Sequence, residues 1–267
     1  METLTHALLR DYADAFRTYG PLSNPVWFLG TEEGGGADLA AAARKILAWD
    51  RAGRPLVAEL DDPAPDSVHL ESPFLRDGGG PAALQTVRSN QVRVLLGLRG
   101  EPLDNARVRR LQGREHGRRG GQTCLMELFP LPSSDSDAWI YDRVAHDPAT
   151  DGPNPFASRR EYREHYLPRR LDTIVSLAAE HRPDALVCTS WTHRGQIRER
   201  LDEVEVPELG LEGARRRALI GRLGDTVVAV CTHPARQAAG PKNAFYHRLG
   251  EALAERMPPG AELARAA

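Results

Sequence analysis

An acidic pair at the end of an apolar run is the first place in this sequence where chemistry could be done. Val26–Gly30 has the pattern of a short buried strand, and Glu32 and Glu33 follow it. The glycine run Gly34–Gly36 comes next, where a backbone or a ligand can approach closely. Open α/β sheets bind ligands beyond the carboxyl ends of their strands. The stretch therefore indicates either a catalytic carboxylate or a solvated turn.

Two further polar groups stand at the ends of later apolar runs. Glu127 lies within Gln122–Phe129, and His233-Pro234 follows Asp225–Cys231. A single histidine after a strand is more often structural than catalytic. A His-Pro turn that faces an acidic turn across one sheet edge favours a functional site instead.

The elements that must position these groups alternate between strand and helix patterns. Helical spacing occurs in Leu4–Tyr19, Asp38–Arg51, Pro81–Leu98, Arg159–Glu180, Thr192–Leu201 and Lys242–Met257. A further strand is expected at Asp184–Ser190. This alternation predicts an α/β protein, a three-layer α/β/α sandwich with a central, mostly parallel four-stranded sheet. Parallel strands would bring Glu32, Glu127 and His233 to one edge.

We expect one domain over residues 1–267, with an N-terminal helix and an irregular insertion around 133–155. A second irregular stretch is expected at Arg54–Gly80, which is rich in proline, aspartate and glycine. The formal net charge of −2 excludes a chain that is basic throughout, although a local basic patch is compatible with it. The most basic segment is Arg107–Arg119, which either faces solvent or contacts phosphates.

Three isolated cysteines, Cys124, Cys188 and Cys231, each lie in an apolar run. Because they form no paired-cysteine motif, we expect buried thiols in a reducing compartment, with no metal and no cofactor. The first residues lack the apolar core of a signal peptide, and no apolar run approaches membrane-spanning length. The sequence therefore predicts a cytoplasmic monomer with no membrane partner.

Three short motifs, in this order, resemble the uracil-DNA glycosylase superfamily. They are Gly30-Thr31-Glu32-Glu33-Gly34, Glu127-Leu128-Phe129-Pro130-Leu131-Pro132 and His233-Pro234-Ala235-Arg236. Members share an acidic or polar catalytic turn after the first strand, a middle strand that ends in a polar residue and prolines, and a later His-Pro-Ser-like loop. The resemblance spans the chain from Val26 to the closing helix.

This resemblance implies a DNA glycosylase that flips a base out of single- or double-stranded DNA and hydrolyses its N-glycosidic bond. Glu32, with Glu33 as its competitor, would stabilise the sugar cation and orient water, and His233 would stabilise the departing base. Glu127 would read the base, on which Phe74 or Phe129 would stack. The expected DNA contacts are Gly34, Arg118, Arg119, Arg236 and Lys242.

The departures from the family pattern bear on the substrate. Glu33 replaces the usual proline, Ala235 the usual serine, and Glu127 the asparagine that reads uracil in several members. A carboxylate accepts hydrogen bonds, and cytosine presents an amino group where uracil presents O4. The sequence therefore predicts a modified cytosine as substrate, for example in invading phage DNA, since removal of normal cytosine would kill the host. Alternatively, Glu127 only pairs with an arginine near the strand end.

Two other functions are compatible with the sequence. The glycine run Gly34–Gly36 could cradle a phosphate in a nucleotide- or nucleoside-processing enzyme, although the sequence has neither a Walker pattern nor a dinucleotide fingerprint. A lesion-binding sensor of the same fold could have lost turnover. Abasic-site formation in an oligonucleotide separates the glycosylase from the sensor.

Overall fold

The structure is a computed structural model of the chain, and it describes residues 3–15, 18–34, 36, 38–58, 84–133, 139–209, 217–234, 242–261 and 263. Phe74 and Arg236, two of the predicted site residues, lie outside the described residues. So does most of the predicted irregular stretch Arg54–Gly80. The side chain of Lys242 is not among those described either.

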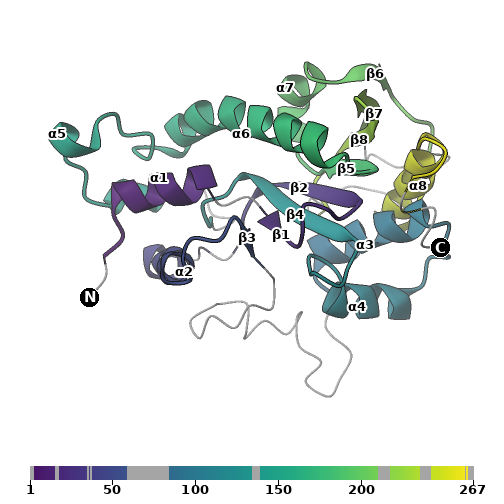
Figure 1. Cartoon of the computed structure of the whole chain (residues 1–267), viewed down its shortest axis with the longest axis horizontal. Helices are drawn as coiled ribbons and strands as arrows, with labels where there is room; N and C mark the ends of the chain where they lie inside the picture. Colours follow the sequence, from purple (N-terminus) through teal and green to yellow (C-terminus); the bar gives the residue numbers. More distant parts are fainter. Residues whose placement is uncertain are drawn as a thin grey trace.

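One mixed sheet runs through the described part of the chain, with strand order β3-β1-β4-β2-β5-β8-β7-β6 (Figure 1). Its bounds are β1 Thr18–Tyr19, β2 Val26–Glu32, β3 Val57–Ala58, β4 Thr123–Phe129, β5 Ala185–Cys188, β6 Asp202–Glu205, β7 Ala218–Leu223 and β8 Thr226–Cys231. The predicted α/β class is confirmed. The predicted sheet of four strands is wrong, because the sheet has eight strands and antiparallel pairs occur on both sides of its parallel centre.

The four strands expected from the sequence form the middle of this sheet. The neighbours β4, β2, β5 and β8 are all paired in parallel. Their carboxyl ends therefore leave the sheet at one edge, as the apolar runs predicted. A strand with a continuous apolar sequence has apolar side chains on both faces, so both faces must be covered. β8 is an example, since all six of its residues are buried.

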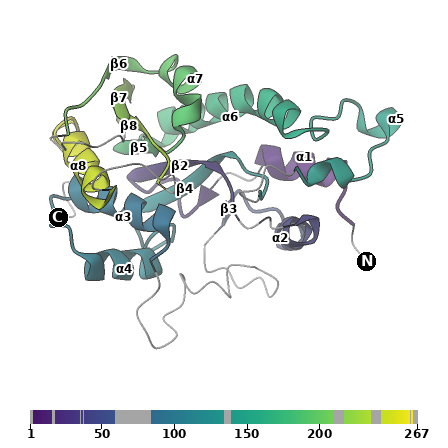
Figure 2. The same cartoon turned by 180° about the vertical axis from the view of Figure 1, so that it is seen from behind.

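Side chains of the central strands alternate between two cores. Trp27 and Leu29 of β2 belong to a cluster with α1 His6–Ala15, α2 Leu39–Arg51 and α6 Arg159–His181. Val26 and Phe28 point to the opposite face. That second cluster includes α3 Thr86–Leu98 and α8 Lys242–Ala254. Helices thus cover both faces, and Figure 2 shows the same layers from behind.

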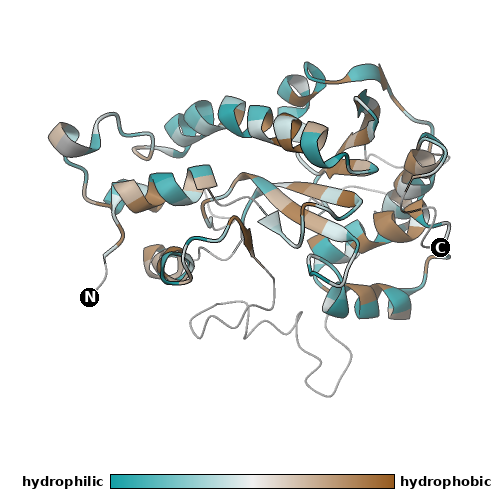
Figure 3. Cartoon of the chain, in the orientation of Figure 1, coloured by the Kyte–Doolittle hydropathy of each residue, from teal (hydrophilic) through white to brown (hydrophobic). Residues whose placement is uncertain are grey.

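Helices α1 and α2 turn one apolar face to this core, whereas α3 is buried at every position from Ser89 to Leu98. Apolar strands cross the centre of the molecule, while the helices mix hydrophilic and hydrophobic positions (Figure 3). Asp38 accepts a hydrogen bond from the Ala41 amide and caps α2 at its amino end. The predicted first helix is too long: α1 ends at Ala15, and Thr18–Tyr19 forms β1. α4 Asn105–Arg114 packs outside α3.

Helices α3 and α8 meet with their backbones in contact. A Cβ atom placed on Gly97 of α3 would overlap the His247 carbonyl of α8, and one on Gly250 would overlap the Val94 carbonyl. Only glycine allows this approach at the two positions.

The insertion around 133–155 is more ordered than predicted wherever it is described. It includes the 3₁₀ turn η1 Tyr141–Arg143 and the short helix α5 Pro148–Asp151. Trp139 Nε1 donates to the Phe156 carbonyl at 2.6 Å, and the Tyr141 hydroxyl donates to the Pro132 carbonyl at 2.6 Å. The second of these bonds fixes the insertion to the segment that follows β4.

No helix in the described part of the chain has both the length and the apolar character needed to cross a membrane.

Candidate active site

The acidic turn and the polar ends of two neighbouring strands meet at the carboxyl edge of the parallel sheet. Gly30 is in register with Glu127 and Glu32 with Phe129 across β2 and β4. On the other side of β2, Thr31 Oγ1 lies 3.0 Å from Ser190 Oγ, just beyond β5. Three of the predicted stretches are therefore adjacent in space.

Glu32 is held at this edge by an arginine of α6. Arg163 donates from Nε and Nη2 to Glu32 Oε1 at 3.0 and 2.7 Å. The Glu32 side chain is 16% exposed, so it remains accessible from solvent while this pair positions it. A carboxylate that is oriented and partly open to water has the properties required of a general base or of a group that stabilises a cation.

Phe129 forms the floor beneath this pair. The Arg163 guanidinium lies 5.6 Å from the centre of the Phe129 ring, and the His193 ring packs edge-on against Phe129 at 5.4 Å. Phe129 is fully buried, so in this conformation it serves as packing and offers no open face for a base to stack on. Burial lowers the pKa of His193, and the nearby Arg163 charge lowers it further, against the opposing effect of Glu32. His193 is therefore neutral at pH 7.

Glu33 points away from this open edge into a cluster of its own. Its carboxylate accepts from the Tyr12 hydroxyl at 3.0 Å and from the Tyr19 hydroxyl, and Lys45 Nζ lies 2.5 Å away. Only 4% of the residue is exposed. Because three partners engage the carboxylate out of reach of solvent, the geometry favours Glu32 over Glu33 as the catalytic group.

Glu127 lies over the backbone of β2. A Cβ on Gly30 would overlap the Glu127 carboxyl group, so the missing side chain provides the space in which this carboxyl group sits. Oε2 is enclosed and has no hydrogen-bond partner among the described residues. Burial, and secondarily the Glu33 carboxylate, raises the pKa of Glu127 to about 8. At pH 7 most molecules therefore hold Glu127 as a neutral acid.

An arginine does contact Glu127, as the alternative interpretation expected, but it contacts the backbone of this residue. Arg170 of α6 is buried and donates from Nη2 to the Glu127 carbonyl oxygen at 2.9 Å. The contact is to the backbone, so it fixes the strand end and does not neutralise the carboxyl group by a direct bond.

The remaining predicted residues are spread over the fold. His233 is half-buried just after β8, which puts it at the same sheet edge, with β5 between its strand and β2. Gly34 is exposed beside the acidic turn, and a side chain there would meet nothing within 4 Å among the described residues.

Arg118 and Arg119 lie in the turn that precedes β4, at the amino end of that strand. Arg119 is exposed, whereas Arg118 is half-buried. The Arg118 charge contributes to lowering the pKa of the buried His116, after burial itself and Arg88. Because β4 runs parallel to β2, the turn before β4 lies at the opposite edge of the sheet from Glu32, which ends β2.

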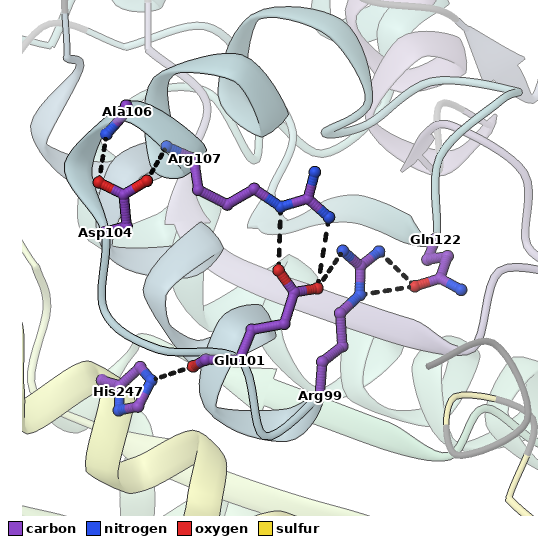
Figure 4. Close-up of polar contacts among 7 residues, drawn as sticks. All are labelled: Arg99, Glu101, Asp104, Ala106, Arg107, Gln122 and His247. Atoms are coloured by element: carbon purple, nitrogen blue, oxygen red, sulfur yellow. Dashed lines mark hydrogen bonds and ion pairs between the residues drawn. The ribbon is translucent and has the colours of Figure 1, made fainter.

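A separate pocket of about 270 Å³ lies near the same amino edge, lined by Glu101, Pro102, Asp104, Ala106, Arg107 and Arg110. Glu101 accepts a hydrogen bond from Arg107 Nε at 2.9 Å and another from Arg99 Nη1 at 3.4 Å (Figure 4). The Arg107 hydrogen bond lowers the pKa of Glu101. Arg107, the first residue of the predicted basic segment, is thereby paired within the protein. The pocket lacks the strand-end carboxyl groups, so we place the site at the other edge.

Four residues around the two carboxyl clusters, Arg163, His193, Lys45 and Arg170, were not predicted from the sequence. Each belongs to a helix or to the turn after β5, where a basic side chain resembles any solvated one. Comparison of the chain with protein-family models, curated proteins and solved structures found no match. The resemblance to the glycosylase superfamily therefore stays a prediction, and function must be inferred from the site.

Proposed function

We propose that this protein is a DNA glycosylase that hydrolyses the N-glycosidic bond of a flipped pyrimidine, with a modified cytosine as the first substrate to test. The observation that carries the proposal is the pair of unlike carboxyl groups at one sheet edge. Glu32 is bound by an arginine and partly open to water, whereas Glu127 is half-buried, has one enclosed oxygen atom and has a pKa raised to about 8. Two carboxyl groups with different environments can take different roles in one reaction.

In this mechanism, Glu32 orients the attacking water and stabilises positive charge on the sugar. Arg163 limits its freedom, which reduces the reorganisation needed in the transition state. His233 stabilises negative charge on the departing base by donating a hydrogen bond. DNA reaches the site from the open side, past Gly34.

The neutral form of Glu127 changes how the base would be read. A carboxylic acid donates from one oxygen and accepts at the other, like an amide. It can donate to cytosine N3 while it accepts from the N4 amino group, or accept from uracil N3 while it donates to O4. The acid itself can therefore pair with either cytosine or uracil, and discrimination between these two bases falls to the other groups around the base. A phage-defence role follows only if a modified cytosine is preferred.

The test is a panel of single- and double-stranded oligonucleotides that contain uracil, deaminated purines or modified cytosines, scored for alkali-labile sites. We expect abasic sites from a modified cytosine, and a single-turnover rate lower by about 100-fold or more in Glu32→Gln. The amide can still accept from Arg163, so the variant should keep the fold. Glu164→Gln is the matched control, because Glu164 is an exposed glutamate on the same helix as Arg163. Full activity of Glu32→Gln would reject the assignment.

A sensor without turnover has one observation in its favour. Glu32 Oε1 already accepts two hydrogen bonds from Arg163, so the water molecule must be engaged through Oε2. If the protein binds a modified oligonucleotide tightly and produces no abasic site over many hours, this second function replaces the first.

A further inference from the structure

Three side chains outside the candidate active site form a separate polar cluster. His6 begins α1, and His146 and Asp151 belong to the insertion. Each offers one nitrogen or oxygen atom, and these atoms all lie within 4.8 Å of one another. His6 is 1% exposed, and the other two are half-buried. The cluster is therefore enclosed at His6 and reached by solvent at the other two residues.

The hydrogen bonds of the two imidazoles determine which nitrogen atoms carry protons. His6 Nε2 lies 3.3 Å from the Val144 carbonyl oxygen, and His146 Nε2 lies 2.9 Å from the Gly152 carbonyl oxygen. Because a carbonyl can only accept, Nε2 must be the donor in each ring. In the neutral rings, Nδ1 consequently carries a lone pair. This is the arrangement in which metal-bound histidines are found, with the second nitrogen bonded to a backbone carbonyl.

His6 Nδ1 is enclosed and has no hydrogen-bond partner among the described residues. A buried acceptor without a partner is costly, and a bound ligand would remove that cost. Asp151 Oδ2 accepts from the Asp147 amide at 2.9 Å, and this bond leaves the carboxylate lone pairs for an ion. Arg10 donates to the carbonyl oxygens of Asp151 and Pro153, so its contact is with the backbone and not with the carboxylate.

We propose that His6, His146 and Asp151 bind a zinc ion that joins α1 to the insertion. Two imidazole nitrogens and one carboxylate oxygen are ligands that Zn²⁺ takes at about 2.0–2.2 Å, with water in the fourth position. Tetrahedral ligand atoms then stand about 3.3 Å apart, so atoms that now lie within 4.8 Å of one another would approach by at most about 1.5 Å on binding. The ion has a structural role. It fixes the helix that also supplies Tyr12 to the Glu33 cluster.

The test measures Zn²⁺ binding to the full chain stripped with chelator, by calorimetry and by metal content after dialysis. We expect one zinc ion per chain and a rise in Tm on its addition. His146→Ala and Asp151→Asn should each weaken binding by more than about tenfold, since loss of even a hydrogen-bond partner behind a ligand costs about 10- to 100-fold. Asparagine can still accept from the Asp147 amide, so that variant keeps the local turn.

His165→Ala is the matched control, because His165 is a half-buried histidine on α6 outside the cluster. It should bind zinc and gain stability as the wild type does, and circular dichroism should show all three variants folded. The proposal is overturned if the wild type binds less than one zinc ion per chain, if His146→Ala binds as tightly as the wild type, or if Mg²⁺, which prefers oxygen ligands, binds equally well.

Discussion

Two carboxyl groups on adjacent strands at one sheet edge have different surroundings. Glu32 meets a guanidinium and solvent, whereas Glu127 lies over Gly30 with one oxygen enclosed. Desolvation disfavours the charged form, and the Glu33 carboxylate adds to that effect. The strand register thus separates a group suited to stabilise a cation from one suited to donate a hydrogen bond.

The raised pKa of Glu127 predicts a pH-dependent stability. Because its pKa rises from the ordinary 4.5 to about 8, the folded chain holds a proton that the unfolded chain has released between these values. The contribution of Glu127 to the free energy of unfolding should therefore be highest below about pH 4.5 and fall as pH rises through 8, by about 2–4 kcal/mol. Urea titrations at pH 5, 7 and 8.5 measure the fall. Glu127→Gln, which does not titrate, should lack it, and an equal fall in both proteins would contradict the assignment.

Gly30 predicts a second residue-level effect. Gly30→Ala places a methyl group where the Glu127 carboxyl group lies, so the acid must move. We expect a decrease of about 1–3 kcal/mol in the free energy of unfolding, as for other overpacked sites. The pH-dependent fall that Glu127 causes should also shrink in this variant, because the displaced acid regains solvent. Gly34→Ala, at an open position, is the control.

Short elements hold Glu33 in place. α1 supplies Tyr12, β1 supplies Tyr19 and α2 supplies Lys45. Burial raises the pKa of both tyrosines, and the Glu33 charge adds to this effect. Burial lowers the pKa of Lys45, while Glu33 opposes that shift. Glu33 thus ties two helices and a two-residue strand to the end of β2, which supports a structural role.

Removal of Lys45 tests this role. Lys45→Met leaves the Glu33 carboxylate buried without its cation, which should cost about 3 kcal/mol in the free energy of unfolding. Arg54→Ala is the control, since its ion pairs with Asp11 and Asp50 are exposed and solvent screens such pairs. Denaturant unfolding compares the two variants. Equal decreases in the free energy of unfolding would show that the buried Lys45–Glu33 pair contributes no more than the exposed pairs.

The sequence was most informative where a strand contains an uninterrupted apolar run. β2, β4, β5 and β8 carry apolar runs that need burial on both faces, so their existence and common edge could be predicted. β1 and β3 have two residues each, too few to show any periodicity. β7 was overlooked because Gly221 and Arg222 interrupt its apolar pattern. Arg163 and His193 reach the site only through tertiary packing, which no local pattern encodes.

At the scale of the whole molecule, the candidate site and the predicted basic turn lie at opposite edges of the sheet. Glu32 ends β2 at its carboxyl end, and Arg118 and Arg119 precede the amino end of β4, its parallel neighbour. Bound DNA would therefore have to cross a face of the molecule to touch both. The exposed Arg119 is better placed for a phosphate contact than the half-buried Arg118.

Salt dependence tests this path. If both arginines contact phosphates, neutralising them together should weaken DNA binding for all sequences alike. The plot of log affinity against log salt should also flatten, by about one unit for each phosphate that the variant no longer neutralises. Arg107→Gln is the control, because Glu101 already pairs with that arginine. Fluorescence anisotropy at several salt concentrations gives the slopes, and an unchanged slope would place the DNA along the carboxyl edge alone.

The backbone contact between α3 and α8 has a consequence for how mutational data on this protein should be interpreted. Gly97 and Gly250 tolerate no side chain, since each faces a carbonyl of the other helix. A saturation screen would therefore score these two positions as intolerant as Glu32. Ranking positions by tolerance alone would place a helix crossing beside Glu32, which we propose to be catalytic. Substitution by alanine distinguishes a packing constraint from a chemical one. Gly97→Ala and Gly250→Ala should destabilise the fold, whereas Glu32→Ala should stay folded and lose only activity.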